Sequence, residues 1–200
     1  MPIQADLFAD TGQAPDSLPQ GFRYRADLID LQAEEQLAAQ LAELPFQPFE
    51  FHGYLGARRV LYFGFRYDYS RRAVVASTPI PDFLLALREQ VADFADRPTD
   101  AFVQVLATEY APGAGIGWHR DKSEFGDVVG VSLLSPCRIR FRRRRKEGWD
   151  RASPRLERRS AYLLSGPTRH EWEHSIAPMD VLRYSITFRT MASGAPRSEH

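Results

Sequence analysis

Residues 102–110 read Phe102-Val-Gln-Val-Leu-Ala-Thr-Glu-Tyr110 and continue through Ala-Pro-Gly-Ala-Gly into Ile-Gly-Trp-His119-Arg-Asp121. β-Branched and aromatic residues recur at short spacing before the Pro-Gly turn, a pattern that predicts a strand. Further strand patterns, separated by turn residues, occupy residues 59–69, 128–134, 138–141, 160–164 and 182–189. This series of short strands indicates a jelly-roll or cupin-like barrel.

Two helices are expected before the main run of strands. Asp30 can cap a helix with leucines at helical spacing that stops before Pro45, and a second helix opens near Pro81. Both helices carry an apolar stripe suited to packing on a core. The predicted fold class is therefore α+β and mainly β, with N-terminal helices packed on one side of the barrel.

The chain has 200 residues, of which 44% are hydrophobic and 26% charged. This composition suits one globular domain and excludes a disordered or collagen-like chain. We expect a flexible segment at 1–20, the domain at 21–190 and a flexible tail at 191–200. No apolar run is long enough for a membrane span, and the acidic start lacks an export signal, so we expect a cytoplasmic monomer without a membrane partner. The single cysteine, Cys137, can form neither an internal disulfide nor a thiolate metal cage, and we expect it to be buried and inert.

The net charge of zero hides an uneven distribution. Residues 138–159 hold ten Arg and Lys146 against three acids, so this segment alone carries +8. Such a basic stretch, with Trp149 inside it, could bind a polyanion such as nucleic acid. The alternative is a solvated hairpin tip with no ligand.

His119 and Asp121 could form part of a metal site. Positions i and i+2 of an extended segment project to the same side, so the imidazole and the carboxylate can converge. A third ligand would have to come from elsewhere in the chain, where the remaining histidines are His52, His170, His174 and His200. Two His and one carboxylate suit Fe(II) and leave adjacent positions open for a cosubstrate and dioxygen.

The segment Arg183-Tyr-Ser-Ile-Thr-Phe-Arg189 alternates between an apolar and a polar face, with a cation at each end of the polar face. If that face looks into the barrel, both arginines need anions, because an unpaired buried charge is costly. A small dicarboxylate would meet both needs. The alternative is a solvated face that makes ordinary cross-strand ion pairs.

Four segments in order then match one family. Tyr110-Ala-Pro-Gly-Ala-Gly-Ile-Gly-Trp-His-Arg-Asp121, Val131-Ser-Leu133, Trp172-Glu-His174 and Arg183-Tyr-Ser-Ile-Thr-Phe-Arg189 together resemble the AlkB family of Fe(II)/2-oxoglutarate dioxygenases. The resemblance implies a double-stranded β-helix. It also implies that His119, Asp121 and His174 bind Fe(II), with His170 at the rim of the site. Arg183 and Arg189 would anchor the carboxylates of 2-oxoglutarate, Tyr110 would hydrogen-bond the distal carboxylate, and Ser185 would lie in the same cosubstrate site.

The substrate side departs from the family pattern. Base-repairing relatives place an acid two residues beyond the aspartate ligand, where this chain has Ser123 followed by Glu124. On the cosubstrate side, Thr108 stands two residues before Tyr110, where a well-studied bacterial member has an asparagine. The segment from Arg58-Arg59 through Tyr69 resembles the family's variable substrate lid. We expect Arg59, Tyr67, Tyr69, Ser123 and Glu124 to contact substrate, and Tyr62 and Phe65 are further candidates for stacking on a base. The lid aromatics could equally be core residues.

The function implied by the resemblance is oxidative demethylation of N-alkylated bases in DNA or RNA. Such a reaction consumes 2-oxoglutarate and O2 and releases formaldehyde, succinate and CO2. Two alternatives remain: a related oxygenase acting on tRNA modifications or protein side chains, and a catalytically idle module that only binds nucleic acid.

Overall fold

The computed structural model describes residues 18–51 and 54–194. The expected flexible ends lie almost wholly outside this range, as do His52 and His200. Three helices and two short 3-10 turns are present: α1 (Leu31–Ala42), η1 (Asp82–Leu84), α2 (Leu85–Ala95), η2 (Thr99–Ala101) and α3 (Gly166–His170). The strands are β1 (Phe22–Arg25), β2 (Gln47–Phe51), β3 (Tyr54–Phe63), β4 (Phe65–Asp68), β5 (Ala73–Ala76), β6 (Phe102–Tyr110), β7 (Ile116–His119), β8 (Phe125–Leu133), β9 (Cys137–Arg144), β10 (Trp149–Ala152), β11 (Arg155–Leu156), β12 (Ala161–Leu164), β13 (Glu173–Ile176) and β14 (Arg183–Met191).

Two antiparallel sheets form the body of the molecule. The larger sheet has the order β1-β12-β8-β14-β6-β3-β2, and the smaller has the order β10-β9-β13-β7, with β11 paired to β9. Neighbours such as β14 and β6 are distant in sequence, as in a jelly roll. The predicted fold class, a double-stranded β-helix with helices on one side, is confirmed.

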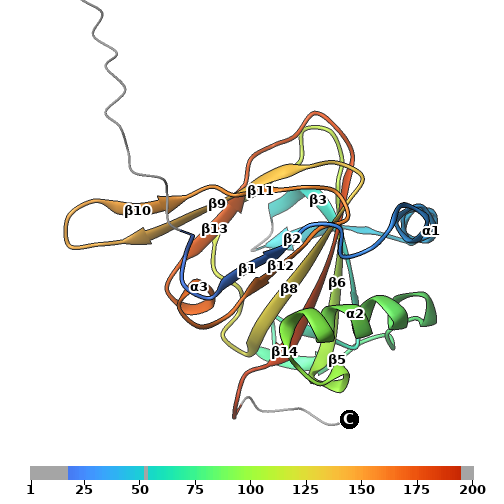
Figure 1. Ribbon diagram of the computed structural model, residues 1–200. Coiled ribbons are helices and arrows are strands. Elements are labelled where there is room, and N and C mark those ends of the chain that lie inside the picture. The colour runs from blue at the N-terminus through green and yellow to red at the C-terminus, as the bar shows by residue number, and fades with distance from the viewer. Residues whose placement is uncertain (1–17, 52–53, 195–200) are drawn as a thin grey trace, which may run out of the picture.

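The larger sheet has a core on each face. Helices α1 and α2 cover the face turned away from the smaller sheet (Figure 1), where Leu41, Leu84 and Val91 pack against Ile186 and Phe188 of β14. A second cluster joins the two sheets and includes Phe22, Val128, Ile139, Phe141 and Leu164. The apolar face of β14 thus belongs to the helical side, which leaves its polar face for the space between the sheets.

Helix α1 begins and ends as the sequence predicts. The Asp30 carboxylate accepts a hydrogen bond from the Ala33 N–H at 2.8 Å, and the helix stops at Ala42, before Pro45. Its Glu34 side chain is fully buried, accepts from the Leu134 N–H at 2.8 Å and pairs with Arg158. This charged contact, which the leucine spacing did not reveal, fixes the helix to the loops of the larger sheet.

The predicted continuous strand over 59–69 is wrong, because the chain breaks at Gly64. Its φ of 74° lies in the left-handed region, and a Cβ there would come within 2.0 Å of the Val103 carbonyl oxygen. The chain therefore leaves the larger sheet after Phe63, and β4 pairs with β5 in a separate hairpin.

Within the described residues, no helix is long and apolar enough to cross a membrane.

Candidate active site

Two histidines from different strands meet on the smaller sheet. His119 ends β7 and lies opposite His174 of β13 in the antiparallel register, with ring centroids 4.2 Å apart. Directly opposed residues of paired strands share a face. The structure therefore brings together two histidines that are 55 positions apart in the sequence, and it places His170 at the edge of the same cavity.

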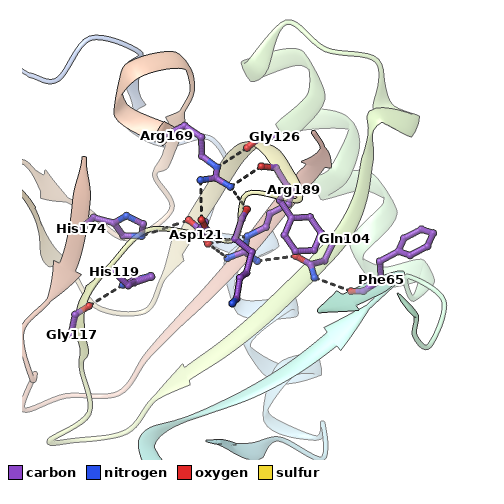
Figure 2. A network of polar contacts seen from close by, with 11 residues as sticks. Phe65, Gln104, Gly117, His119, Asp121, Gly126, Arg169, His174 and Arg189 are labelled. Atoms are coloured by element: carbon purple, nitrogen blue, oxygen red, sulfur yellow. Dashed lines mark hydrogen bonds and ion pairs between the residues drawn. The ribbon is translucent and has the colours of Figure 1, made fainter. Parts of the chain in front are cut away.

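Asp121 completes the group (Figure 2). Its Oδ2 lies 3.7 Å from His174 Nε2, and its Oδ1 accepts hydrogen bonds from Arg189 Nη2 at 2.7 Å and Nε at 3.2 Å. The residues around Asp121 are held in place by Arg169, whose buried guanidinium donates to the carbonyls of Asp121, Lys122, Phe125 and Gly126. Arg169 escaped the sequence analysis because a cation that binds backbone carbonyls leaves no motif.

Burial and neighbouring charges set the protonation of these three groups. Burial, with a smaller contribution from the neighbouring His119, lowers the pKa of His174 to about 3. Burial also lowers the pKa of His119, against the opposing charge of Asp121. Burial alone would raise the pKa of Asp121, but Arg189 and the two histidines hold it below its usual value. The histidines are thus neutral and the aspartate ionised near neutral pH, as metal ligands must be.

The donor set fits Fe(II). His119 Nδ1 lies 2.9 Å from the Gly117 carbonyl oxygen and donates to it, which leaves the lone pair of Nε2 free for a metal. Two imidazoles and one carboxylate are the ligands of non-haem Fe(II) oxygenases. As the side chains stand, no three His, Cys, Asp or Glu residues of the described chain form a group that could hold a metal ion. Arg189 binds one oxygen of the Asp121 carboxylate.

Arg183 fits the carboxylate of a diacid. It is 0% exposed, its Nε donates to Ser132 Oγ at 3.0 Å, and its guanidinium carbon lies 5.1 Å from the centre of the Tyr110 ring. Both terminal nitrogens, Nη1 and Nη2, are buried and make no well-formed hydrogen bond among the described residues, although the Tyr110 hydroxyl lies close enough to interact with the guanidinium. An uncompensated buried guanidinium is very costly, so these nitrogens call for an anion supplied from outside the chain.

Arg189, at the other end of β14, is already paired. Besides Asp121, it donates to Gln104 Oε1 at 3.1 Å, and Gln104 in turn donates to the Phe65 carbonyl at 3.0 Å (Figure 2). The expected contact of Arg189 with 2-oxoglutarate would therefore be shared with the aspartate ligand. Gln104 was missed because its partners come from β14 and β4, which the sequence does not connect.

A cavity of about 800 Å³ joins most of these groups. Arg183 does not line it and lies behind the wall, next to the ring of Tyr110, which does. The polar face of β14 lines it through Ser185, Thr187 and Arg189, as the alternation predicts. Tyr110, Thr108 and the three proposed iron ligands also lie on its wall. The proposed iron ligands and three of the expected cosubstrate residues, Tyr110, Ser185 and Arg189, therefore share one cavity.

Aromatic residues line another part of the cavity. Tyr62, Tyr67 and Tyr69 all lie on the wall, and the Lys122 ammonium lies 4.4 Å and 4.6 Å from the ring centres of Tyr67 and Tyr69. Phe65 does not line the cavity. Two of the expected substrate residues, Tyr67 and Tyr69, thus lie where a base could stack.

The expectation for Arg59 requires correction. Its guanidinium forms a two-pronged ion pair with Glu109, with both contacts at 2.7 Å, and it does not line the cavity. Side chains alternate along β3, so Arg58 lines the wall instead and rests 3.9 Å from the centre of the Phe49 ring. The same side of β3 carries Tyr62, which also lines the wall.

Ser123 and Glu124 are separated by the structure. Ser123 lines the cavity, whereas Glu124 does not, although the Ser123 hydroxyl lies 3.4 Å from a Glu124 carboxylate oxygen. Successive side chains in an extended segment point in different directions. The expected role of Glu124 as a direct substrate contact is therefore corrected, and Asp121 is the one acidic residue on the described wall.

Comparison with known proteins places this site in a class. The model of the 2OG-Fe(II) oxygenase superfamily matches residues 31–189, and the chain belongs to that superfamily. This confirms the predicted kind of enzyme, a 2-oxoglutarate-dependent dioxygenase, and the predicted Fe(II), 2-oxoglutarate and O2.

Within the superfamily, the predicted AlkB relationship is confirmed by curated relatives and by the fold. The chain is 28% identical over 146 residues to the alkylated DNA repair protein ALKBH8 homolog of Arabidopsis thaliana. It is 29% identical over 142 residues to the tRNA (carboxymethyluridine(34)-5-O)-methyltransferase ALKBH8 of Mus musculus. These matches cover 61% and 66% of this chain, and only 42% and 20% of the two relatives.

A solved structure shares the architecture. The structure of OsALKBH1 superposes with a TM-score of 0.62 at 17% sequence identity, covering 85% of this chain and 96% of that one. At this identity the likeness concerns the fold.

Proposed function

We propose that this protein oxidatively demethylates N-alkylated nucleobases in DNA or RNA. The observation that carries the proposal is the meeting, in one cavity, of His119, Asp121 and His174 with a wall of tyrosines, beside the unpaired Arg183 guanidinium. The cavity volume of about 800 Å³ falls in the range of sites that bury a small ligand, about 300–1,000 Å³. Such a space suits an organic diacid together with one extruded base.

Each residue has a role that follows from its contacts. The neutral imidazoles and the ionised Asp121 would hold the metal, while Arg189 keeps the carboxylate in place and Arg169 fixes the residues around it. Arg183, oriented by Ser132, would receive the distal carboxylate of 2-oxoglutarate. When bound, iron with 2-oxoglutarate and O2 supplies the oxidation of a C–H bond.

The overall reaction balances without a further reductant. 2-Oxoglutarate is oxidised to succinate and CO2 and takes up one atom of O2, while the other atom enters the methyl group. The C–N bond then breaks, so that formaldehyde leaves and the base nitrogen keeps a proton. The protein supplies placement and shielding, and the substrate base would have to leave its stack to reach the cavity.

The charge of the cavity favours a second candidate, oxygenation of an uncharged or anionic modified base such as one in tRNA. Five cations line the described wall, Arg58, Arg120, Lys122, Arg169 and Arg189, against the single carboxylate of Asp121. Asp121 is committed to Arg189 and to the metal, so no described acid on the wall is free to pair with a cationic lesion. A cationic base would meet repulsion from Arg58 and Lys122.

The test is a panel of N-methylated single- and double-stranded DNA and RNA oligomers with Fe(II), ascorbate and 2-oxoglutarate. We expect stoichiometric formaldehyde and succinate from the wild type and none from His119→Ala or Asp121→Ala. Oligomers carrying 3-methylthymine, which is uncharged, and 3-methylcytosine, which is cationic, test the charge argument. Succinate without loss of any methylated base would exclude demethylation of nucleic acid, and a preference for the cationic lesion would exclude the charge argument.

A further inference from the structure

One face of the smaller sheet is covered by arginine and tryptophan. In β9, Cys137, Ile139 and Phe141 are buried against the second core, so Arg138, Arg140, Arg142 and Arg144 point to the opposite face. The antiparallel register adds Arg155 beside Arg138, Arg151 beside Arg142 and Trp149 beside Arg144. We call this set, together with Trp118 of β7, the Arg–Trp face.

The side chains on this face form a continuous row. The guanidinium carbons of Arg140 and Arg142 lie 5.2 Å and 4.4 Å from the centre of the Trp118 ring. Arg142 and Arg144 lie 4.8 Å and 5.2 Å from the centre of the Trp149 ring. Arginine and aromatic groups thus alternate from the edge strand β7 to the hairpin β9–β10, which projects from the body of the molecule (Figure 1).

Most of the charge on the Arg–Trp face is uncompensated. Arg142 pairs with Glu173 at 2.6 Å and Arg155 with Glu157 at 2.5 Å. Among the described residues, Arg138, Arg140, Arg144 and Arg151 form no ion pair with a carboxylate. Their neighbours near the hairpin tip behave differently, since Arg143 and Arg145 both pair with Asp150. The excess charge predicted for residues 138–159 is therefore concentrated on one face.

We propose that the Arg–Trp face binds single-stranded nucleic acid. Arginines that lack carboxylate partners can neutralise phosphates, and indole rings offer stacking platforms for any base. Trp118 also lines the cavity, so a strand on this face would run toward the cavity rim. The inference rests on the proposed function only for this last point, because the binding itself requires no chemistry.

A membrane surface suits the Arg–Trp face less well. Binding in a lipid interface buries aliphatic or aromatic side chains that protrude into it. The exposed large hydrophobic residues of the described chain lie elsewhere: Leu18, Tyr24, Leu31, Tyr69, Leu85, Val181 and Leu182. The tryptophans of the face instead lie between guanidinium groups.

The test measures binding of unmodified, labelled oligo-dT and oligo-U across a salt series. Arg144→Gln/Arg151→Gln removes two exposed arginines that have no ion pair, so folding should be retained. We expect the slope of log affinity against log salt to become shallower by about 1.4, which is about 0.7 for each lost phosphate contact. The control, Arg23→Gln/Arg25→Gln, removes the same charge from β1 of the other sheet and should leave the slope unchanged. Because Arg23 pairs with Asp96, a melting curve checks that this variant is folded.

Tryptophan fluorescence tests the stacking. Trp172 is buried, so Trp118 and Trp149 should account for quenching by the oligomer. Trp149→Leu should lose part of the quench and bind about tenfold more weakly. A melting curve checks that the variant is folded.

The possible outcomes separate this proposal from the enzyme assignment. If both double variants bind alike, or if heparin and anionic vesicles compete as well as oligo-dT and Trp149→Leu has no effect, the Arg–Trp face is not a nucleic-acid site. That result leaves demethylation of a methylated oligomer untouched. If the predicted losses appear while no methylated base is consumed, the surface proposal stands and the proposed function fails.

Discussion

The two ends of β14 carry the same residue in opposite circumstances. Arg183 and Arg189 are both buried on the polar face of one strand. Arg189 is satisfied within the chain by Asp121 and Gln104, whereas neither terminal nitrogen of Arg183 makes a well-formed hydrogen bond among the described residues. The difference supports our proposal that Arg189 holds the aspartate that would bind the metal, whereas Arg183 would receive an anion from outside the chain.

Replacing Arg189 should have the largest effect and should act on stability. Arg189→Met leaves the buried Asp121 carboxylate without its cation, and breaking a buried pair in this way costs about 3–5 kcal/mol. Urea denaturation of the apo protein measures the loss, and Arg189→Lys, which keeps the charge, should lose less. If Arg189→Met were as stable as the wild type, the ion pair with Asp121 would not exist in solution.

Replacing Arg183 should act on binding. Arg183→Met removes an uncompensated charge from a buried site, so the unfolding free energy of the apo protein should stay the same or rise. Its affinity for 2-oxoglutarate should fall by about 2–5 kcal/mol, since the distal carboxylate loses its buried partner. Calorimetric titration measures the affinity. Equal destabilisation of the apo protein by Arg183→Met and Arg189→Met would erase the contrast between the two ends.

Glu34 is a buried carboxylate whose ion pair with Arg158 has no expected part in cosubstrate binding. Glu34→Ala leaves the Leu134 N–H and Arg158 unpaired, which should cost about 1–3 kcal/mol of unfolding free energy. In thermal melting, each kcal/mol corresponds to about 2–4 °C for a chain of this size. The affinity for 2-oxoglutarate should not change, and a marked change would mean that loss of stability, rather than loss of an anion partner, explains the effect of Arg183→Met.

The smallest effect should come from the residue that orients Arg183. Ser132→Ala removes the acceptor of the Arg183 Nε proton, which should weaken 2-oxoglutarate binding by about 1 kcal/mol, or about fivefold. Titration at fixed Fe(II) measures the change, and Ser132→Thr, which keeps a hydroxyl, should recover part of it. Full affinity in Ser132→Ala would show that packing alone orients the guanidinium.

The sequence was sufficient where the interaction is local or periodic. Its β-branched and aromatic residues predicted β6 to the residue, alternation assigned the two faces of β14, and Asp30 predicted the start of α1. Parity in β3 was not decidable in the same way, because a shift of one residue exchanges Arg58 for Arg59. Which arginine faces the cavity depends on Glu109, which lies 50 residues later on the neighbouring strand β6 and forms an ion pair with Arg59.

Contacts that join distant segments were beyond sequence reasoning. Arg169 binds carbonyls of a loop more than 40 residues earlier, and Gln104 links Arg189 to the Phe65 carbonyl. Backbone acceptors carry no side-chain identity, so nothing in the sequence marks them. The choice of His174 over the other histidines likewise came from the family resemblance, and the register of β13 with β7 then supplied a physical reason.

We propose that Arg183 binds the distal carboxylate of 2-oxoglutarate beside an iron held by His119, Asp121 and His174. Anaerobic calorimetric titration with Fe(II), followed by 2-oxoglutarate, tests it in the wild type, Arg183→Met and His174→Ala. The account predicts one Fe(II) and one 2-oxoglutarate per wild-type chain, iron without 2-oxoglutarate in folded Arg183→Met, and loss of tight iron binding in His174→Ala. Wild-type affinity for 2-oxoglutarate in folded Arg183→Met would contradict the claim.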